Sequence, residues 1–212
     1  MTITTTATSF GSLNVRPPLI ASGQRIGILG GSFNPPHQGH LNISTMALKK
    51  LELDRIWWLV TPCNPIKSQQ NLMDLRQRID AATELSNHPR IDVTAFEASL
   101  PTNYTADTLT FLKRRFPSVD FVWLMGADNL ATFHKWQKWH TIFETMPIAV
   151  FDRPGFRFKA LSSPAAQTYK SRRITNRHAI RLAHQYPPAW QFVTLPLTHL
   201  SSTELRKKVP FS

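Results

Sequence analysis

Acidic residues are scarce in this chain of 212 residues: Asp and Glu number 13 against 25 Lys and Arg, for a formal net charge of +12 at pH 7. The first acidic residue is Glu52, so the residues before it offer no carboxylate side chain to a metal ion. A balance this basic predicts a polyanionic partner.

Cysteine and long apolar runs are also nearly absent. The single cysteine, Cys63, excludes an internal disulfide framework and a Cys-rich zinc site, and it fits a reducing compartment, which we take to be the cytoplasm. No stretch approaches the roughly 18 consecutive apolar residues of a membrane span, so we expect no membrane partner. Because 42% of the residues are hydrophobic, the chain is apolar enough to form a packed core.

The first 24 residues show neither a helical nor a strand-like apolar pattern. They are rich in Thr and Ser, and they carry one basic and no acidic residue. We therefore predict a disordered extension over residues 1–24, followed by one folded domain over residues 25–212. Removal of residues 1–22 is then expected to change neither activity nor the melting temperature.

From Arg25 onward, short apolar runs alternate with segments of helical periodicity. The runs predict strands at Ile26–Leu29, Ile56–Val60, Ile91–Ala95, Phe121–Met125, Ile148–Phe151 and Phe192–Leu195. The periodic segments predict helices at Gly39–Lys50, Leu72–Leu85, Ala106–Phe116, Trp136–Glu144 and Thr175–Gln185. Residues 156–173 look irregular and basic. The alternation is typical of an α/β fold with a doubly wound, Rossmann-like parallel sheet, which binds ligands beyond the carboxyl ends of its strands, where the strand order reverses.

The first predicted strand runs into the segment Gly-Gly-Ser-Phe-Asn-Pro-Pro-His-Gln-Gly-His at residues 30–40. Its glycines allow a ligand to approach the backbone closely, and the amides that open the following helix carry partial positive charge. His37 and His40 are three residues apart, which places both rings on one face of the first helical turn. The segment predicts an anion site, and the alternative is a proline-rich turn with two surface histidines.

This segment resembles the phosphate-binding signature of the nucleotidyltransferase superfamily, whose members transfer a nucleoside monophosphate from a nucleoside triphosphate. The resemblance implies that ATP is bound by Gly30, Gly31, Ser32, Phe33, His37 and His40, with both histidines touching phosphates.

A second segment, Leu-Ser-Ser-Thr-Glu-Leu-Arg at residues 200–206, forms a helix capping box when taken alone, with Ser201 as N-cap and Glu204 three residues later. It also resembles the superfamily's second signature, Ile-Ser-Ser-Thr-x-x-Arg. That resemblance implies that the β- and γ-phosphates of ATP are held by Ser202, Thr203 and Arg206. A guanidinium one turn into a helix suits this role because it adds charge-assisted hydrogen bonds to a phosphate.

Three segments between these signatures resemble the nicotinate mononucleotide adenylyltransferase family. Asn-Pro-Ile-Lys implies acceptor contacts from Asn64 and Lys67, the latter to the acceptor phosphate. Tyr-Thr-Ala-Asp-Thr-Leu implies that backbone amides near Tyr104 and Thr105 receive the nicotinate carboxylate, while Thr105 equally suits an ordinary helix N-cap.

The third segment runs from Gly126 to Trp136. The resemblance implies that Gly126 and Asp128 bind ATP, with Asp128 at the adenosine half, and that Trp136 stacks on the pyridine ring. Core packing beside Trp139 is the alternative for Trp136.

The resemblance implies transfer of the adenylyl group of ATP to nicotinate mononucleotide, which gives deamido-NAD and pyrophosphate in NAD biosynthesis. The attacking phosphate is already ionised at neutral pH, so catalysis requires positioning and charge stabilisation, with His37, His40 and Arg206 as the catalytic residues. Mg²⁺ is expected to enter with ATP, because the site motifs offer no carboxylate cluster and no metal site of their own.

Two other functions stay open. One is an adenylyltransferase with another phosphorylated acceptor, such as nicotinamide mononucleotide or phosphopantetheine, or a related cytidylyltransferase. The other is a basic RNA-binding module, suggested by the basic residues between Lys170 and Arg181. Because no RNA-binding signature accompanies them, we do not expect nucleic acid as a partner. The sequence leaves the oligomeric state open.

Overall fold

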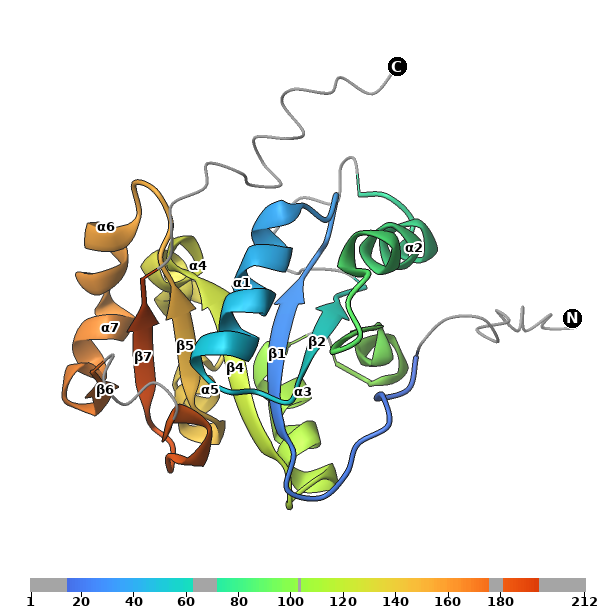
Figure 1. The fold of residues 1–212 in the computed structure, drawn as a ribbon. Helices are drawn as coiled ribbons and strands as arrows, with labels where there is room; N and C mark the ends of the chain where they lie inside the picture. Colours follow the sequence, from blue (N-terminus) through green and yellow to red (C-terminus); the bar gives the residue numbers. More distant parts are fainter. Residues whose placement is uncertain (1–14, 63–71, 103, 176–180, 195–212) are drawn as a thin grey trace, which may run out of the picture.

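The computed structural model describes residues 15–62, 72–102, 104–175 and 181–194 (Figure 1). Its strands are β1 (Arg25–Gly31), β2 (Arg55–Val60), β3 (Ile91–Thr94), β4 (Asp120–Gly126), β5 (Ile148–Phe151), β6 (Arg173–Ile174) and β7 (Trp190–Val193). They form one parallel sheet in the order β3-β2-β1-β4-β5-β7-β6. The predicted doubly wound α/β fold is confirmed, and the strand order reverses between β1 and β4.

The α-helices described are α1 (Gln38–Lys50), α2 (Leu75–Ser86), α3 (Thr105–Arg115), α4 (Ala127–Thr132), α5 (Trp139–Thr145), α6 (Arg157–Leu161) and α7 (Pro164–Thr168). Short 3₁₀ helices are η1 (Phe96–Ser99), η2 (Phe133–Lys135) and η3 (Lys170–Arg172). Apolar residues of α1 and α2 pack on one face of the sheet, and those of α3, α4, α5, α6 and α7 pack on the other. In Figure 1, α1 lies in front of the sheet and α3 and α5 lie behind it.

The central strands are buried on both faces, as expected for a parallel sheet covered by helices. In β2, Trp57 and Trp58 are both fully buried, and they belong to the cores on opposite faces of the sheet. A shift of β2 by one residue would exchange these two side chains between the cores, so their packing fixes the strand register. The register in turn aligns the carboxyl ends of the strands.

Several predicted boundaries differ from the structure. The helix predicted from Leu72 begins at Leu75, because the carboxylate of Asp74 accepts a hydrogen bond from the Arg76 amide and caps it. The helix predicted from Trp136 begins at Trp139, because Trp136 has an extended backbone. The last predicted strand is β7, which begins two residues earlier than expected.

Short helices account for the other differences. The stretch 156–173 contains α6, α7 and η3 instead of irregular backbone, and α4 directly follows β4. Elements of five or six residues are too short to show a helical period, and burial of Ala160, Ala165 and Ala166 fixes the first two in place. Of the helix predicted over 175–185, residues 176–180 lie outside the described residues and 181–184 are a 3₁₀ turn.

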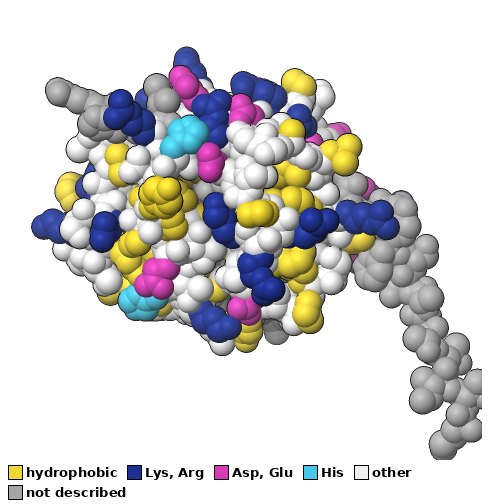
Figure 2. All heavy atoms as spheres, turned by 90° about the horizontal axis from the view of Figure 1, so that it is seen from below, with side chains coloured by type: hydrophobic (Ala, Val, Ile, Leu, Met, Phe, Trp, Pro, Cys, Tyr) yellow, Lys and Arg dark blue, Asp and Glu magenta, His cyan; other side chains and the backbone are white. Residues whose placement is uncertain are grey.

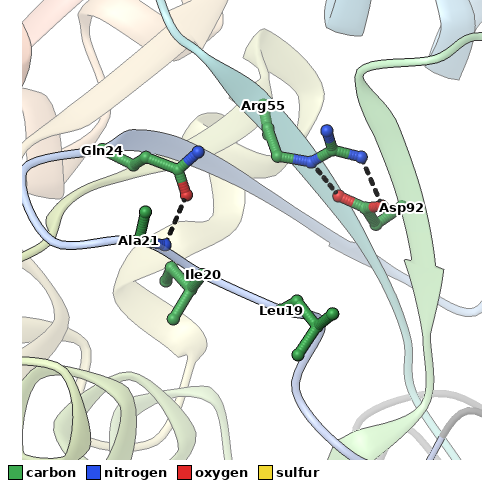
Figure 3. A pocket seen from close by; sticks show the side chains of 6 residues that line it. All are labelled: Leu19, Ile20, Ala21, Gln24, Arg55 and Asp92. Atoms are coloured by element: carbon green, nitrogen blue, oxygen red, sulfur yellow. Dashed lines mark hydrogen bonds and ion pairs between the residues drawn. The ribbon is translucent and has the colours of Figure 1, made fainter.

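The expectation of an unpacked N-terminal extension is corrected for residues 15–24. The Thr94 hydroxyl donates a hydrogen bond of 3.1 Å to the carbonyl of Arg16, and Ile20 packs against the core on the α3 side. Figure 3 shows Leu19, Ile20 and Ala21 on one side and the ion pair of Arg55 and Asp92 on the other. Together they line a pocket of about 590 Å³ at the amino ends of β2 and β3. Residues 1–14 lie outside the described residues, so the expectation for them stays a prediction.

The face at the amino ends of the strands, seen in Figure 2, carries Lys and Arg side chains interspersed with Asp, Glu and hydrophobic side chains. Such a distribution is typical of a solvated surface, whereas nucleic-acid binding favours basic residues gathered on one stripe. Within the described residues, no helix is long and apolar enough to cross a membrane.

These contacts change the expected effect of truncation. A chain that begins at residue 23 loses the Arg16 acceptor and uncovers the core beside Ile20, which we expect to lower the free energy of unfolding by about 1–2 kcal/mol. For a chain of this size, that loss lowers the melting temperature by roughly 2–8 °C. A chain that begins at residue 15 keeps both contacts and serves as the control. Thermal unfolding followed by circular dichroism measures both, and equal melting temperatures would contradict the prediction.

Candidate active site

The candidate site lies where β1 and β4 end side by side, at the reversal of strand order. The segment after β1 opens helix α1, and the segment after β4 opens helix α4. Such a switch point is where doubly wound sheets bind ligands, because the two following helices diverge to opposite faces. Two of the segments with sequence signatures therefore meet in space.

Aromatic packing sets the course of the backbone after β1. A side chain at Gly30 would place its Cβ 2.4 Å from the ring of Trp123, so glycine is required here by a neighbouring side chain. Phe33 has a left-handed backbone with φ of 46°, and its buried ring stacks on Trp58 at 5.1 Å between centroids and lies 4.5 Å from the His40 ring. This packing holds the unfavourable backbone in place.

His37 and His40 together cap the start of α1. His37 is the N-cap, and its Nδ1 accepts a hydrogen bond of 3.0 Å from the Gly39 amide. The Nδ1 of His40 accepts one of 3.1 Å from the His37 amide, and the two ring centroids lie 3.9 Å apart. Because each Nδ1 is an acceptor, we assign the proton of each ring to Nε2, and the two capping bonds fix the orientation of both rings at the positive end of the helix.

His37 is buried, with 4% of its surface exposed. Burial, and after it the nearby charge of Arg153, lower the pKa of His37 to about 4. The ring is therefore neutral near pH 7 and offers a phosphate an N–H donor rather than a full positive charge.

Asp128 and Arg153 form an ion pair between the start of α4 and the segment after β5. The Arg153 Nε lies 3.2 Å from Oδ1 of Asp128, which is in the first turn of α4. A Cβ at Gly126 would lie 2.3 Å from that oxygen and 2.9 Å from the Arg153 Nε. Gly126 thus leaves room for the ion pair. Packing therefore explains why a glycine stands at this position, which the sequence resemblance assigns to ATP binding.

Arg78 is a residue of this region that the sequence analysis missed. Its guanidinium is buried and donates hydrogen bonds of 2.7–3.0 Å to four carbonyls, which belong to Ser32, Thr61, Pro62 and Met73. It therefore joins the segment after β1 to the segment after β2. The signal in the sequence is its position on the buried face of α2, four residues before Ala82.

On the expected acceptor side, α3 begins at Thr105 and its N-cap is Tyr104, so the interpretation of Thr105 as N-cap is wrong by one residue. The Thr105 side chain is then free of the capping role, while its amide lies in the first turn, where it has no intrahelical acceptor. Trp136 is partly buried, with its ring 5.0 Å from that of Phe133. Part of the residue nevertheless remains exposed to solvent.

Five predicted site residues lie outside the described residues. They are Asn64, Lys67, Ser202, Thr203 and Arg206.

The carboxylates near the site are engaged by arginines. Asp128 pairs with Arg153, and the buried Asp152 accepts hydrogen bonds from Arg157. Within the described part of the chain, no group of three or more His, Cys, Asp or Glu side chains could hold a metal ion.

The chain matches the model of the cytidylyltransferase-like family over residues 28–208. It is 50% identical over 182 residues to a protein of Brucella suis biovar 1, with 86% of this chain and 94% of the relative covered. It is 52% identical over 182 residues to a protein of Bradyrhizobium sp. strain ORS 278, with 86% and 95% covered. Both relatives bear the name probable nicotinate-nucleotide adenylyltransferase.

Among solved structures, the nicotinic acid mononucleotide adenylyltransferase of Plasmodium falciparum complexed with NaAD has a TM-score of 0.67 to this chain, with 19% identity and 87% of this chain and 83% of the other covered. The same protein complexed with APC has a TM-score of 0.65. At this identity the likeness supports the shared fold.

The depressed pKa of His37 predicts a pH dependence of stability. Between pH 6.5 and about pH 4 the unfolded chain binds a proton at His37 and the folded chain does not, so stability that is complete above pH 6.5 is lost as the pH falls. The loss is on the order of 3 kcal/mol from this group.

The variant His37→Asn keeps a side chain that can accept from the Gly39 amide, and it should lack this component of the pH dependence. Urea unfolding of both proteins from pH 7 to pH 4 gives the difference between their free energies of unfolding. The contributions of the other titrating groups cancel in this difference. If the free energies of unfolding of the two proteins fell in parallel with pH, this pH dependence could not be assigned to His37.

Proposed function

The chain belongs to the nicotinate-nucleotide adenylyltransferase family, and from this premise we propose that it joins the adenylyl group of ATP to nicotinate mononucleotide at the carboxyl ends of β1 and β4. The family expected from the motifs is thereby confirmed. The observation that carries the location of the site is the start of α1, where the rings of His37 and His40 lie 3.9 Å apart between centroids and are oriented by backbone amides at the helix N-terminus. This arrangement suits the phosphates of ATP.

In the proposed reaction, a phosphate oxygen of nicotinate mononucleotide attacks the α-phosphorus of ATP. The new phosphorus–oxygen bond forms as the bond from the α-phosphorus to the bridging oxygen breaks, and pyrophosphate leaves with that electron pair. No proton has to be removed from the nucleophile. His37, His40 and Arg206 would act by donating hydrogen bonds to oxygens whose negative charge increases in the transition state.

Each neutral imidazole has a defined direction in this scheme. Because the Nδ1 atoms of His37 and His40 are held by backbone amides, the Nε2–H groups need no reorientation when ATP binds. Preorganised donors stabilise developing charge more than mobile donors do, since they have little reorganisation left to undergo. A bound polyphosphate would also raise the pKa of His37, because nearby negative charge favours the protonated ring.

The remaining contacts of ATP are proposed from the signatures. Backbone amides of residues 30–33 would lie along the phosphates, and Asp128, held by Arg153, would contact the adenosine half. Ser202, Thr203 and Arg206 would bind the β- and γ-phosphates.

The acceptor would be held at both of its ends. Asn64 and Lys67 would contact the acceptor nucleotide, with Lys67 at its phosphate. Amides near Tyr104 and Thr105 at the start of α3 would receive the carboxylate, as suits a helix N-terminus, and Trp136 would stack on the pyridine ring.

Mg²⁺ would reach the site bound to phosphate oxygens of ATP and would supply charge neutralisation there. The donor set supports this route, because Asp128 and Asp152 each pair with an arginine and no group of three or more possible ligands occurs in the described part of the chain. Hard cations of this size are commonly held by substrate phosphates together with few protein ligands. The lone cysteine of the chain supports action in the reducing cytoplasm.

The first prediction for this function concerns His40. We expect His40→Ala to lower kcat by about 100-fold or more, because one preorganised donor to transition-state charge is worth about 2.7–4 kcal/mol. The matched control is His184→Ala, since His184 pairs with Asp120 at the amino end of β4. The control should change stability by less than about 0.5 kcal/mol and leave kcat unchanged. Pyrophosphate release and circular dichroism measure both, and near-native kcat in a folded His40→Ala protein would remove His40 from the chemistry.

The second prediction concerns the acceptor. A carboxylate accepts from two amides, whereas a carboxamide turns its NH₂ toward one of them and leaves a buried donor unpaired, at a cost of about 1–3 kcal/mol. The chain should therefore prefer nicotinate over nicotinamide mononucleotide by roughly 5- to 150-fold in kcat/KM. Trp136→Ala should weaken both acceptors alike, since stacking depends on the ring and not on its substituent.

Pyrophosphate release with ATP across a panel of acceptors is the experiment that tests the proposed function. The panel includes nicotinate mononucleotide, nicotinamide mononucleotide and phosphopantetheine. Equal kcat/KM for the first two would contradict the proposed selectivity, and release with phosphopantetheine alone would assign another acceptor class.

A further inference from the structure

The two parts of the proposed acceptor site come from different elements. Tyr104 and Thr105 open helix α3, and Trp136 lies between η2 and α5. An ion pair joins the two elements: the Lys138 Nζ donates to Oδ1 of Asp107 at 2.9 Å. Asp107 is in the first turn of α3, and Lys138 is two residues after Trp136.

At the α3 end, the carboxylate of Asp107 is linked to the backbone that would receive the acceptor. Its Oδ2 accepts a hydrogen bond of 3.0 Å from the Thr102 hydroxyl, and the same hydroxyl oxygen accepts one of 3.2 Å from the Tyr104 amide. The hydrogen bond from Lys138, and to a smaller extent that from Thr102, hold the pKa of the Asp107 carboxyl below its usual range. The carboxyl of Asp107 therefore remains ionised at neutral pH.

At the other end, Lys138 has a left-handed backbone, with φ of 54° and ψ of 36°. This conformation is unfavourable for a residue with a long side chain, and it makes the turn from the extended backbone of Trp136 into helix α5. The side chains of Lys138 and Asp107 are 52% and 38% exposed, and exposed ion pairs add little to stability. Because the ion pair adds little stability and yet ends at this strained turn, we attribute to it a role in holding the position of the turn.

We propose that Asp107 and Lys138 are positioning residues that hold the Trp136 ring at a fixed place relative to the amides at the start of α3, so that one acceptor nucleotide contacts both. The inference rests on the proposed function, because it takes those two elements as the acceptor site. The pair then governs acceptor affinity and the preference for acid over amide, and it leaves ATP binding unaffected.

The test is a double-mutant cycle. Lys138→Gly removes the ammonium group and relieves the left-handed backbone, and Asp107→Asn removes the charge while keeping an acceptor for the Thr102 hydroxyl. We expect each single variant, and the double variant equally, to raise KM for nicotinate mononucleotide by about 5- to 20-fold. KM for ATP and the melting temperature should stay unchanged, and the preference over nicotinamide mononucleotide should fall.

Two controls separate positioning from loss of charge. Lys138→Arg keeps the positive charge and should restore most of the acceptor affinity. Lys135→Ala removes a neighbouring exposed lysine from η2 and should leave KM for nicotinate mononucleotide unchanged. If Lys135→Ala raised KM as much as Lys138→Gly, a general attraction of the anionic acceptor would explain the effect and overturn the inference.

Other outcomes decide the inference directly. Unchanged KM for nicotinate mononucleotide in both single variants, equal rises of KM for ATP, or additive effects in the double variant would overturn it while the proposed function stands. If the unmodified protein released no pyrophosphate with ATP and nicotinate mononucleotide, the proposed function would fail, and this inference with it.

Discussion

Two hydrogen bonds from backbone amides to imidazole Nδ1 atoms at the start of α1 are the interactions on which the geometry of the site depends. Each imidazole accepts from a backbone amide through Nδ1, so one pair of bonds caps the helix, orients two rings and sets both tautomers. A serine or aspartate would cap the helix as well, but neither would leave an N–H donor pointing away from it. Structural and chemical requirements are thus met by the same atoms.

The surrounding core keeps these rings in place. The Trp58 indole donates to the Ser44 hydroxyl at 2.7 Å, and that hydroxyl donates to the His40 carbonyl at 2.9 Å. Phe33 lies against both Trp58 and His40, so the histidines rest on a packed aromatic layer. Glycines at the ends of β1 and β4 give space to a tryptophan ring and to an ion pair. The rigidity expected of a preorganised site therefore comes from the core beneath it.

The sequence predicted the fold and the meeting of the two segments at β1 and β4 because apolar runs and glycine-rich turns are local signals. It failed for α4, α6 and α7, because helices of five or six residues are too short for a repeating helical pattern of apolar residues to be recognised. It also missed the packing of residues 15–24, because the Arg16 carbonyl carries no side-chain signature for its bond to Thr94. The left-handed turn at Lys138 depends on tertiary contacts. All the predicted site residues remain predictions, and those at 64, 67, 202, 203 and 206 also lie outside the described residues.

The buried Arg78 has a consequence for the order in which two ligands meet the protein. Its guanidinium bonds to the carbonyl of Ser32 on one side and to those of Thr61 and Pro62 on the other, so motion of either segment is restricted by the other. A ligand that immobilises one segment leaves the second with less conformational entropy to lose. Linkage makes this reciprocal, so under the proposed function we expect a ligand of the segment after β1 and a ligand of the segment after β2 to bind with positive cooperativity.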